Sequence, residues 1–189
     1  AVISTMLPGL KPSVIDKTVA VLAERLLPAG ASIVADRRVA HETEALAREM
    51  AGAHADLIVI FGASAITDRA DVIPAALERA GGRIEHFGMP VDPGNLLLIG
   101  ALGGVPVIGA PGCARSPREN GFDWVLHRLL ADVPVTRRDI QRMGVGGLLM
   151  EIVSRPQPRD AAQPELPPLE MSRPNTAVEV LAAGRSSRM

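Results

Sequence analysis

Short runs of β-branched and aliphatic residues alternate with amphipathic stretches along most of this chain, and this alternation restricts its fold more than any other feature. The runs at residues 2–5, 32–35, 57–61, 84–87, 96–99 and 105–109 have the length of strands. Several stretches between them carry apolar residues at helical spacing, notably KPSVIDKTVAVLAERLL and the segments 43–53 and 71–80. Strands that alternate with helices are typical of βα units on a largely parallel sheet, so we predict an α/β domain.

Two of the helices have apparent start signals. Ser13 is followed three residues later by Asp16, which is the spacing of a capping box. Ser116 is followed by Pro117, a residue favoured at the first helical position, and then by Glu119. We therefore predict that Ser13 and Ser116 cap their helices.

Composition limits the classes of function. Apolar residues make up 47% of the 189 residues and aromatic residues only 2%, so the core is aliphatic. The net charge of −1 gives no electrostatic argument for binding nucleic acid or an anionic membrane surface, and no apolar run is long enough to span a bilayer. Cys113 is the single cysteine, which excludes an internal disulfide and suits a reducing compartment. We expect a cytoplasmic protein without a nucleic-acid or membrane partner.

The pattern changes in the last quarter of the chain. Six prolines occur between residues 153 and 175, together with Arg, Gln and Glu, and they prevent a regular helix. We therefore predict one domain over residues 1–152 and a Pro-rich linker over residues 153–176.

The loop after residues 57–61 consists mainly of small residues and leads to Asp71 at the start of a predicted helix. Backbone N–H groups in such a loop, and at a helix N-terminus, favour a phosphate. A carboxylate beside a phosphate commonly holds a divalent cation or accepts a proton, although Asp71 is also in place for a plain N-cap. Ser64 is either a nucleophile or a hydroxyl bonded to local backbone.

Two Pro-Gly pairs, Pro93-Gly94 and Pro111-Gly112, mark chain reversals. The second pair leads toward the helix expected after Ser116. We therefore expect residues 112–115 to form a second anion-binding site, in which Arg115 is available to neutralise charge. Cys113 lies in this segment, and it is either an activated, metal-ligating thiol or a buried inert thiol.

Taken together, the segments FGASAITDRADV, GGRIEHFGMPVDPGNLLLIG and GGVPVIGAPG, followed by a helix, resemble the molybdopterin-binding domain of molybdenum-cofactor biosynthesis proteins (MoeA- and MogA-like). That family contains molybdopterin adenylyltransferases and molybdenum insertases. Its glycine loop and Asp-Val pair are matched here by Gly62, Ser64 and Asp71-Val72, and its two Pro-Gly turns by the pairs named above. The pieces agree in order and spacing over residues 2–131.

The resemblance implies a three-layer αβα domain with a mostly parallel sheet and a cleft at the strand ends that binds molybdopterin, the molybdenum cofactor or a nucleotide form. It implies that Asp71 is the catalytic residue or a metal ligand, with magnesium as the candidate ion. We also expect a homo-oligomer. The residues implied to bind the cofactor are Gly62, Ala63, Ser64, Ala65, Thr67, Asp92, Gly94, Asn95, Gly112, Cys113 and Ser116.

The chain also departs from the family pattern. The first strand is followed by no acidic pair, although Thr5 is present, and His41-Glu42 replaces the Asp-Asp pair before the second helix. Ala63 replaces a loop glycine, and Cys113 replaces the Asn after the last Pro-Gly. Several of the missing groups are those expected to bind molybdate, metal or an adenylyl group. The resemblance therefore implies binding of the pterin more than turnover.

The last nine residues, LAAGRSSRM, resemble the opening of nucleotidyltransferases that attach CMP or GMP to the molybdenum cofactor. We therefore expect residues 177–189 to be the start of such a domain, and the chain to be the pterin-binding part of a larger fusion protein. The open alternatives are an active adenylyltransferase or insertase, a nucleotide pyrophosphatase, and a non-catalytic oligomerisation scaffold with a degenerate cleft.

Overall fold

The computed structural model describes residues 1–144, which belong to the first of the two units into which the chain divides, Ala1–Met150. The predicted boundary at residue 152, the Pro-rich linker and residues 177–189 lie outside the described residues. None of the helices in residues 1–144 combines the length and apolar character needed to cross a membrane.

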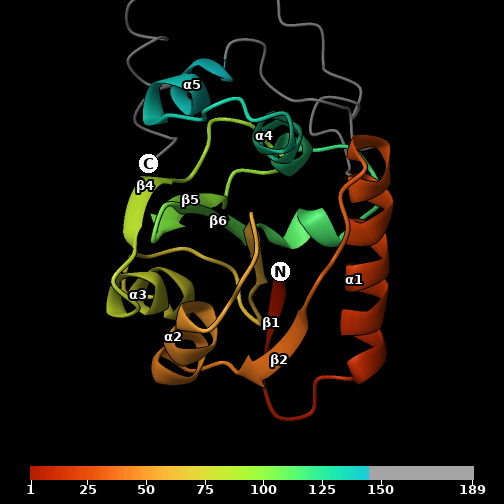
Figure 1. Ribbon diagram of the computed structural model, residues 1–189, viewed down its shortest axis with the longest axis vertical. Helices are drawn as coiled ribbons and strands as arrows, with labels where there is room; N and C mark the ends of the chain where they lie inside the picture. Colours follow the sequence, from red (N-terminus) through yellow and green to blue (C-terminus); the bar gives the residue numbers. More distant parts are fainter. Residues whose placement is uncertain (145–189) are drawn as a thin grey trace, which may run out of the picture. The chain divides into compact units, whose positions relative to one another are not determined.

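Six strands form one sheet in the order β2-β1-β3-β6-β5-β4 (Figure 1). Neighbouring strands are parallel from β2 to β6, whereas β5 runs antiparallel to both of its neighbours. The prediction of an α/β fold with a mostly parallel sheet is thus confirmed. The strands are β1 (Val2–Met6), β2 (Asp36–Ala40), β3 (Ile58–Phe61), β4 (Arg83–Phe87), β5 (Leu98–Leu102) and β6 (Val105–Ala110).

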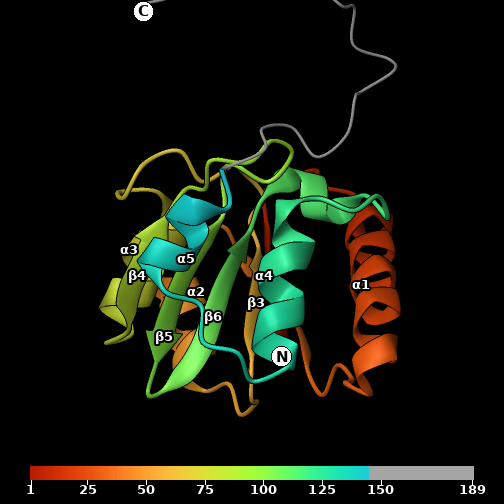
Figure 2. The same ribbon diagram turned by 90° about the horizontal axis from the view of Figure 1, so that it is seen from above.

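Helices cover both faces of the sheet, with α2 and α3 on one side and α4 and α5 on the other (Figures 1 and 2). Because side chains alternate along a strand, β3 sends Val59 and Phe61 into one core cluster and Ile58 and Ile60 into the other. The first cluster includes residues of α1, α4 and α5, and the second those of α2 and α3. The helices are α1 (Pro12–Leu26), α2 (Thr43–Ala51), α3 (Val72–Arg79), α4 (Gly121–Leu130) and α5 (Arg137–Arg142).

The register of the sheet brings the loops of interest to one edge. Phe61 at the end of β3 pairs with Ala110 at the end of β6, and Leu98 at the start of β5 pairs with both Gly109 and Phe87. The segments that follow β3, β4 and β6 therefore all leave the sheet at the carboxyl ends of its parallel strands. In open α/β sheets this is the edge where ligands bind.

Two predicted strands are displaced. The strand expected at residues 32–35 is instead β2 at Asp36–Ala40, an edge strand that pairs only with β1 and is largely exposed. An exposed edge strand needs no apolar alternation, so the pattern pointed to the apolar residues that precede it. The strand expected at residues 96–99 runs further, to Leu102, and turns into β6 through Gly103 and Gly104, both at positive φ.

Both predicted helix caps are wrong. Helix α1 starts at Pro12 after Lys11, so Ser13 lies inside it and makes no capping bond. Ser116 ends a short 3₁₀ helix, η2 (Gly112–Arg115), and α4 starts after Asn120, which forms a capping box with Asp123. At the start of α4 both hydrogen bonds of the Asn120–Asp123 capping box form. Ser116 Oγ accepts only from the N–H of Arg118, over 3.3 Å, and no α-helix begins there.

Candidate functional site

A chain of hydrogen bonds joins the end of β1 to the segments that follow β2 and β3, at the carboxyl edge of the sheet. Thr5 Oγ1, at the end of β1, accepts from the N–H of Ala63 over 2.8 Å and lies 2.7 Å from His41 Nδ1. The other ring nitrogen of His41, Nε2, lies 2.8 Å from Ser64 Oγ. Thr5 is buried, His41 is half-buried and Ser64 is exposed, so these hydrogen bonds run from the core to the surface of the loop after β3.

Asp71 stands at the N-cap position of α3, but its carboxylate does not bond to the helix. Oδ2 instead accepts from the N–H of Thr67 over 2.6 Å, from the N–H of Asp68 over 2.8 Å and from Thr67 Oγ1 over 3.2 Å. These bonds, assisted by the nearby His41, hold the pKa of Asp71 below its ordinary value. The carboxylate therefore closes the 67–71 loop as an anion.

Arg115 brings a cation to the same loop from η2. Its Nη2 donates to Gly62 O over 2.7 Å, its Nη1 donates to Thr18 Oγ1 over 3.0 Å, and its guanidinium lies 5.4 Å from the ring centroid of Phe61. Burial lowers its pKa, yet a guanidinium stays protonated at neutral pH. Within residues 1–144 Arg115 forms no ion pair, and both acceptors of its hydrogen bonds are neutral.

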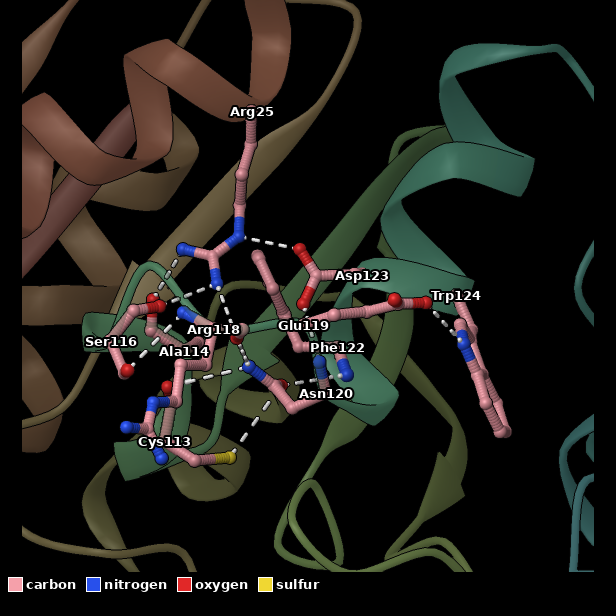
Figure 3. Close-up of polar contacts among 10 residues, drawn as sticks. All are labelled: Arg25, Cys113, Ala114, Ser116, Arg118, Glu119, Asn120, Phe122, Asp123 and Trp124. Carbon is pink, nitrogen blue, oxygen red and sulfur yellow. Dashed lines mark hydrogen bonds and ion pairs between the residues drawn. The ribbon is translucent and has the colours of Figure 1, made fainter. Parts of the chain in front are cut away.

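A second arginine, Arg25 of α1, fixes the segment that carries Arg115 (Figure 3). Arg25 Nε bonds to Asp123 Oδ1 over 2.5 Å, and the two side chains are 8% and 6% exposed. Its terminal nitrogens donate to the carbonyls of Ala114 and Ser116 over 2.8 and 2.6 Å. Asp123 in turn accepts from the N–H of Asn120, so α1, η2 and the start of α4 are tied together.

A family model described as "Probable molybdopterin binding domain" matches residues 1–132. The chain belongs to this family. It is also similar to the solved structure of a molybdopterin biosynthesis MoeA protein from Pyrococcus horikosii, with 25% identity and a TM-score of 0.50. The match covers 70% of this chain and 34% of that one, so this chain spans about a third of that protein. No curated protein matches.

The residues predicted from the family's glycine loop do lie together in this molybdopterin-binding domain. Gly62 begins the loop, and a side chain there would collide with Ser64 O at 2.6 Å and Ile73 Cδ1 at 2.9 Å. Ala65 and Ile66 have N–H groups that donate to no acceptor within residues 1–144. Backbone N–H donors without a protein acceptor on such a loop suit a phosphate oxygen.

The predicted cofactor-binding residues Asp92, Gly94 and Asn95 differ in their surroundings. Gly94, at a φ of 131°, is buried, and a side chain there would lie 2.8 Å from the Cα of Gly121. Its role in the structure is close packing of the Pro-Gly turn against α4. Asn95 is exposed, and its carbonyl accepts from the N–H of Met89. Asp92 is close enough to Cys113 for its charge to act on that thiol.

Cys113 lies in η2 beside Asn120, and the structure supports the inert alternative. Burial raises the pKa of its thiol, and the charges of Asp92 and Asp123 raise it further. Its Sγ lies 3.6 Å from Asn120 Oδ1. Gly112 is exposed with open space where a side chain would stand, and Ser116 gives its carbonyl to Arg25.

In the described part of the chain the site has no metal-binding cluster, and two cavities lie away from it. Within residues 1–144 no three His, Cys, Asp or Glu side chains are placed to hold a metal ion. A cavity of about 530 Å³ is lined by residues of α4, α5 and the segment between them, and a second cavity of about 270 Å³ lies near Ala1 and Leu57. None of the predicted site residues lines either cavity. The case for the site therefore rests on charge and hydrogen bonding.

Two residues of this site were missed in the sequence. In the sequence, Thr5 and His41 stand out only where the chain differs from the family pattern. Their spacing in the sequence gives no indication that they contact Ser64. His41 is 36 residues from Thr5 and 23 from Ser64 along the chain. The usable signal is position, because each lies at or just after the end of a parallel strand.

Proposed function

We propose that this domain binds molybdopterin or the molybdenum cofactor at the carboxyl edge of its sheet, with the phosphate of the ligand between Arg115 and the loop that follows β3. The single observation that carries the proposal is the half-buried guanidinium of Arg115, which has no carboxylate partner within the described residues. A buried charge is costly unless it is paired, so this position favours an anionic ligand.

The geometry of Arg115 suits such a ligand. Its guanidinium carries five N–H donors in a planar fork, and the bonds to Thr18 and Gly62 use only part of them. Arginine forks bind phosphate in a bidentate manner, and the guanidinium carbon lies over the Phe61 ring, 5.4 Å from its centroid. The N–H groups of Ala65 and Ile66 add neutral donors on the same loop.

The structure favours a structural part for Asp71 over a catalytic or metal-binding one. One of its carboxylate oxygens already accepts three bonds within its own loop. Within residues 1–144 Asp71 belongs to no group of three His, Cys, Asp or Glu side chains placed to hold a metal ion. We therefore propose binding of the pterin without turnover on this domain.

The wider context follows from the last residues of the chain. We propose, from their similarity to nucleotidyltransferases, that this domain holds the pterin for a fused transferase. We propose further that the protein is a cytoplasmic homo-oligomer. The product of such a fusion is a dinucleotide form of the cofactor.

The test is a titration of the chain with molybdopterin, followed by tryptophan fluorescence and calorimetry. We expect wild type and Asp71→Ala to bind, and Arg115→Met to bind much more weakly. Failure of wild type to bind would refute the proposal and leave the scaffold alternative. Magnesium-dependent release of product from a nucleotide, lost in Asp71→Ala, would instead establish an enzyme at this site.

A further inference from the structure

The hydrogen bonds among Ala63, Thr5, His41 and Ser64 have a direction that can be worked out from the donors available. Thr5 is 1% exposed, and its oxygen already accepts from the N–H of Ala63. The hydroxyl therefore has one proton to place. Within residues 1–144 the acceptor that the structure offers for it is His41 Nδ1, at 2.7 Å.

A buried hydroxyl proton without an acceptor carries the full desolvation penalty of that group. If His41 carried its own proton on Nδ1, both protons would meet between the same two atoms, and that of Thr5 would be left without an acceptor. The buried hydroxyl therefore selects the neutral tautomer in which Nδ1 is bare and Nε2 carries the proton.

The tautomer decides the role of Ser64. With the proton on Nε2, His41 donates to Ser64 Oγ over their 2.8 Å contact. Ser64 then accepts from His41, and its own hydroxyl proton is free to point away from the ring. In the opposite tautomer Ser64 would donate to Nε2, which is the arrangement of a base-activated nucleophile.

We propose that Thr5 and His41 are positioning residues that hold Ser64 as a hydrogen-bond donor toward an anionic oxygen of the bound ligand, rather than as a nucleophile. This inference rests on the proposed function for its ligand, a phosphate-bearing pterin. Ser64 is exposed, and it directly follows Ala63 in the loop that Gly62 and Arg115 anchor, so its hydroxyl proton is available to a phosphate next to that guanidinium.

The first measurement needs no ligand. Long-range proton–nitrogen correlation NMR distinguishes a bare ring nitrogen from a protonated one, and it is recorded on the full chain at a pH above the usual range of histidine titration. We expect Nδ1 of His41 to be bare and Nε2 to be protonated. A protonated Nδ1 in wild type would overturn the inference, whatever the protein binds.

Substitutions at position 5 test the cause. Thr5→Ser keeps the hydroxyl and should keep the tautomer, whereas Thr5→Val removes it and should let the proton populate Nδ1. Thr5→Ser protects the test if the valine variant fails to fold. An unchanged tautomer in a folded Thr5→Val would overturn the role of Thr5.

The role of Ser64 is tested with inorganic phosphate as the probe, followed by amide shifts of residues 62–66. We expect Ser64→Ala to weaken phosphate binding about tenfold, as for loss of a hydrogen bond to a charged group, and Ser13→Ala, on the exposed start of α1, to leave it unchanged. Equal binding by Ser64→Ala would overturn the donor role, and so would labelling of Ser64 by a fluorophosphonate. Absence of phosphate binding in wild type would refute the proposed anion site itself, with the tautomer still measured separately.

Discussion

The ion pair of Arg25 and Asp123 is expected to stabilise the whole domain, and Arg25→Met tests this. Methionine keeps most of the aliphatic volume but removes the charge and the donors. Asp123 is then left as a carboxylate that is 6% exposed, with the N–H of Asn120 as its one remaining partner within residues 1–144. The carbonyls of Ala114 and Ser116 lose the donor that Arg25 supplies. Breaking a buried pair from one side costs about 3–5 kcal/mol.

The exposed ion pair between Arg79 and Glu44 provides a matched control. Its side chains are 64% and 62% exposed, so Arg79→Met should cost only about 0–1 kcal/mol. Urea unfolding followed by far-UV circular dichroism measures both variants. With a slope of about 2 kcal/mol per M, Arg25→Met should lower the urea midpoint by roughly 1.5–2.5 M.

A midpoint for Arg25→Met within about 0.5 M of that for Arg79→Met would refute the reasoning. A double variant, Arg25→Met with Asp123→Asn, adds a check on its cause. Because asparagine carries no charge to strand, the double variant should lose less stability than the sum of the two single changes.

Further predictions concern single residues. Ser4 has a buried hydroxyl without a hydrogen-bond partner in the described residues, so Ser4→Ala should raise the free energy of unfolding by about 1 kcal/mol. A lower stability of Ser4→Ala in urea unfolding would contradict this. Because the pKa of Cys113 is raised, its alkylation by iodoacetamide should be slow at neutral pH and should accelerate only above the pH at which ordinary thiols ionise. An alkylation rate equal to that of free cysteine would contradict the interpretation of Cys113 as an inert thiol. Because the pKa of Asp71 is lowered, its carboxylate stabilises the 67–71 loop above the ordinary carboxyl pKa, and this stabilisation is lost as the pH falls through the lowered value. The amide exchange rates of Thr67 and Asp68 should increase in that pH range in wild type. They should not increase there in Asp71→Asn.

Local patterns in the sequence were enough to predict the class of fold and the main loop of the site. The alternation of strands with amphipathic helices marked β1, β3 and β6, because buried strands must be apolar, and it also located the edge strand β4. It failed at β2, since an exposed edge strand has no such requirement. The spacing of the glycine loop likewise placed Ser64, Thr67 and Asp71 in one segment, because a short connection between a strand and a helix keeps its residues close together.

What the sequence could not supply was contact between distant segments. Arg115 lies 53 residues from Gly62 along the chain, and Arg25 lies 98 residues from Asp123. Asp71 looked like a ligand because its type and place fit one, but whether its oxygens bond to its own loop is a matter of local geometry that residue types do not determine. The same limit applied to the hydrogen bonds among Thr5, His41 and Ser64.

We propose that the charge of Arg115 binds the phosphate of molybdopterin, and the affinities of Arg115→Met and Arg118→Met for molybdopterin measure this contribution. Both arginines lie in the segment between β6 and α4, but Arg118 is exposed and its side chain makes no hydrogen bond or ion pair within residues 1–144. Loss of a desolvated charge from a ligand contact costs about 2–5 kcal/mol, so the Kd of folded Arg115→Met should rise at least about 30-fold, and that of Arg118→Met less than about twofold. Equal affinities for molybdopterin in the two folded variants would contradict the account.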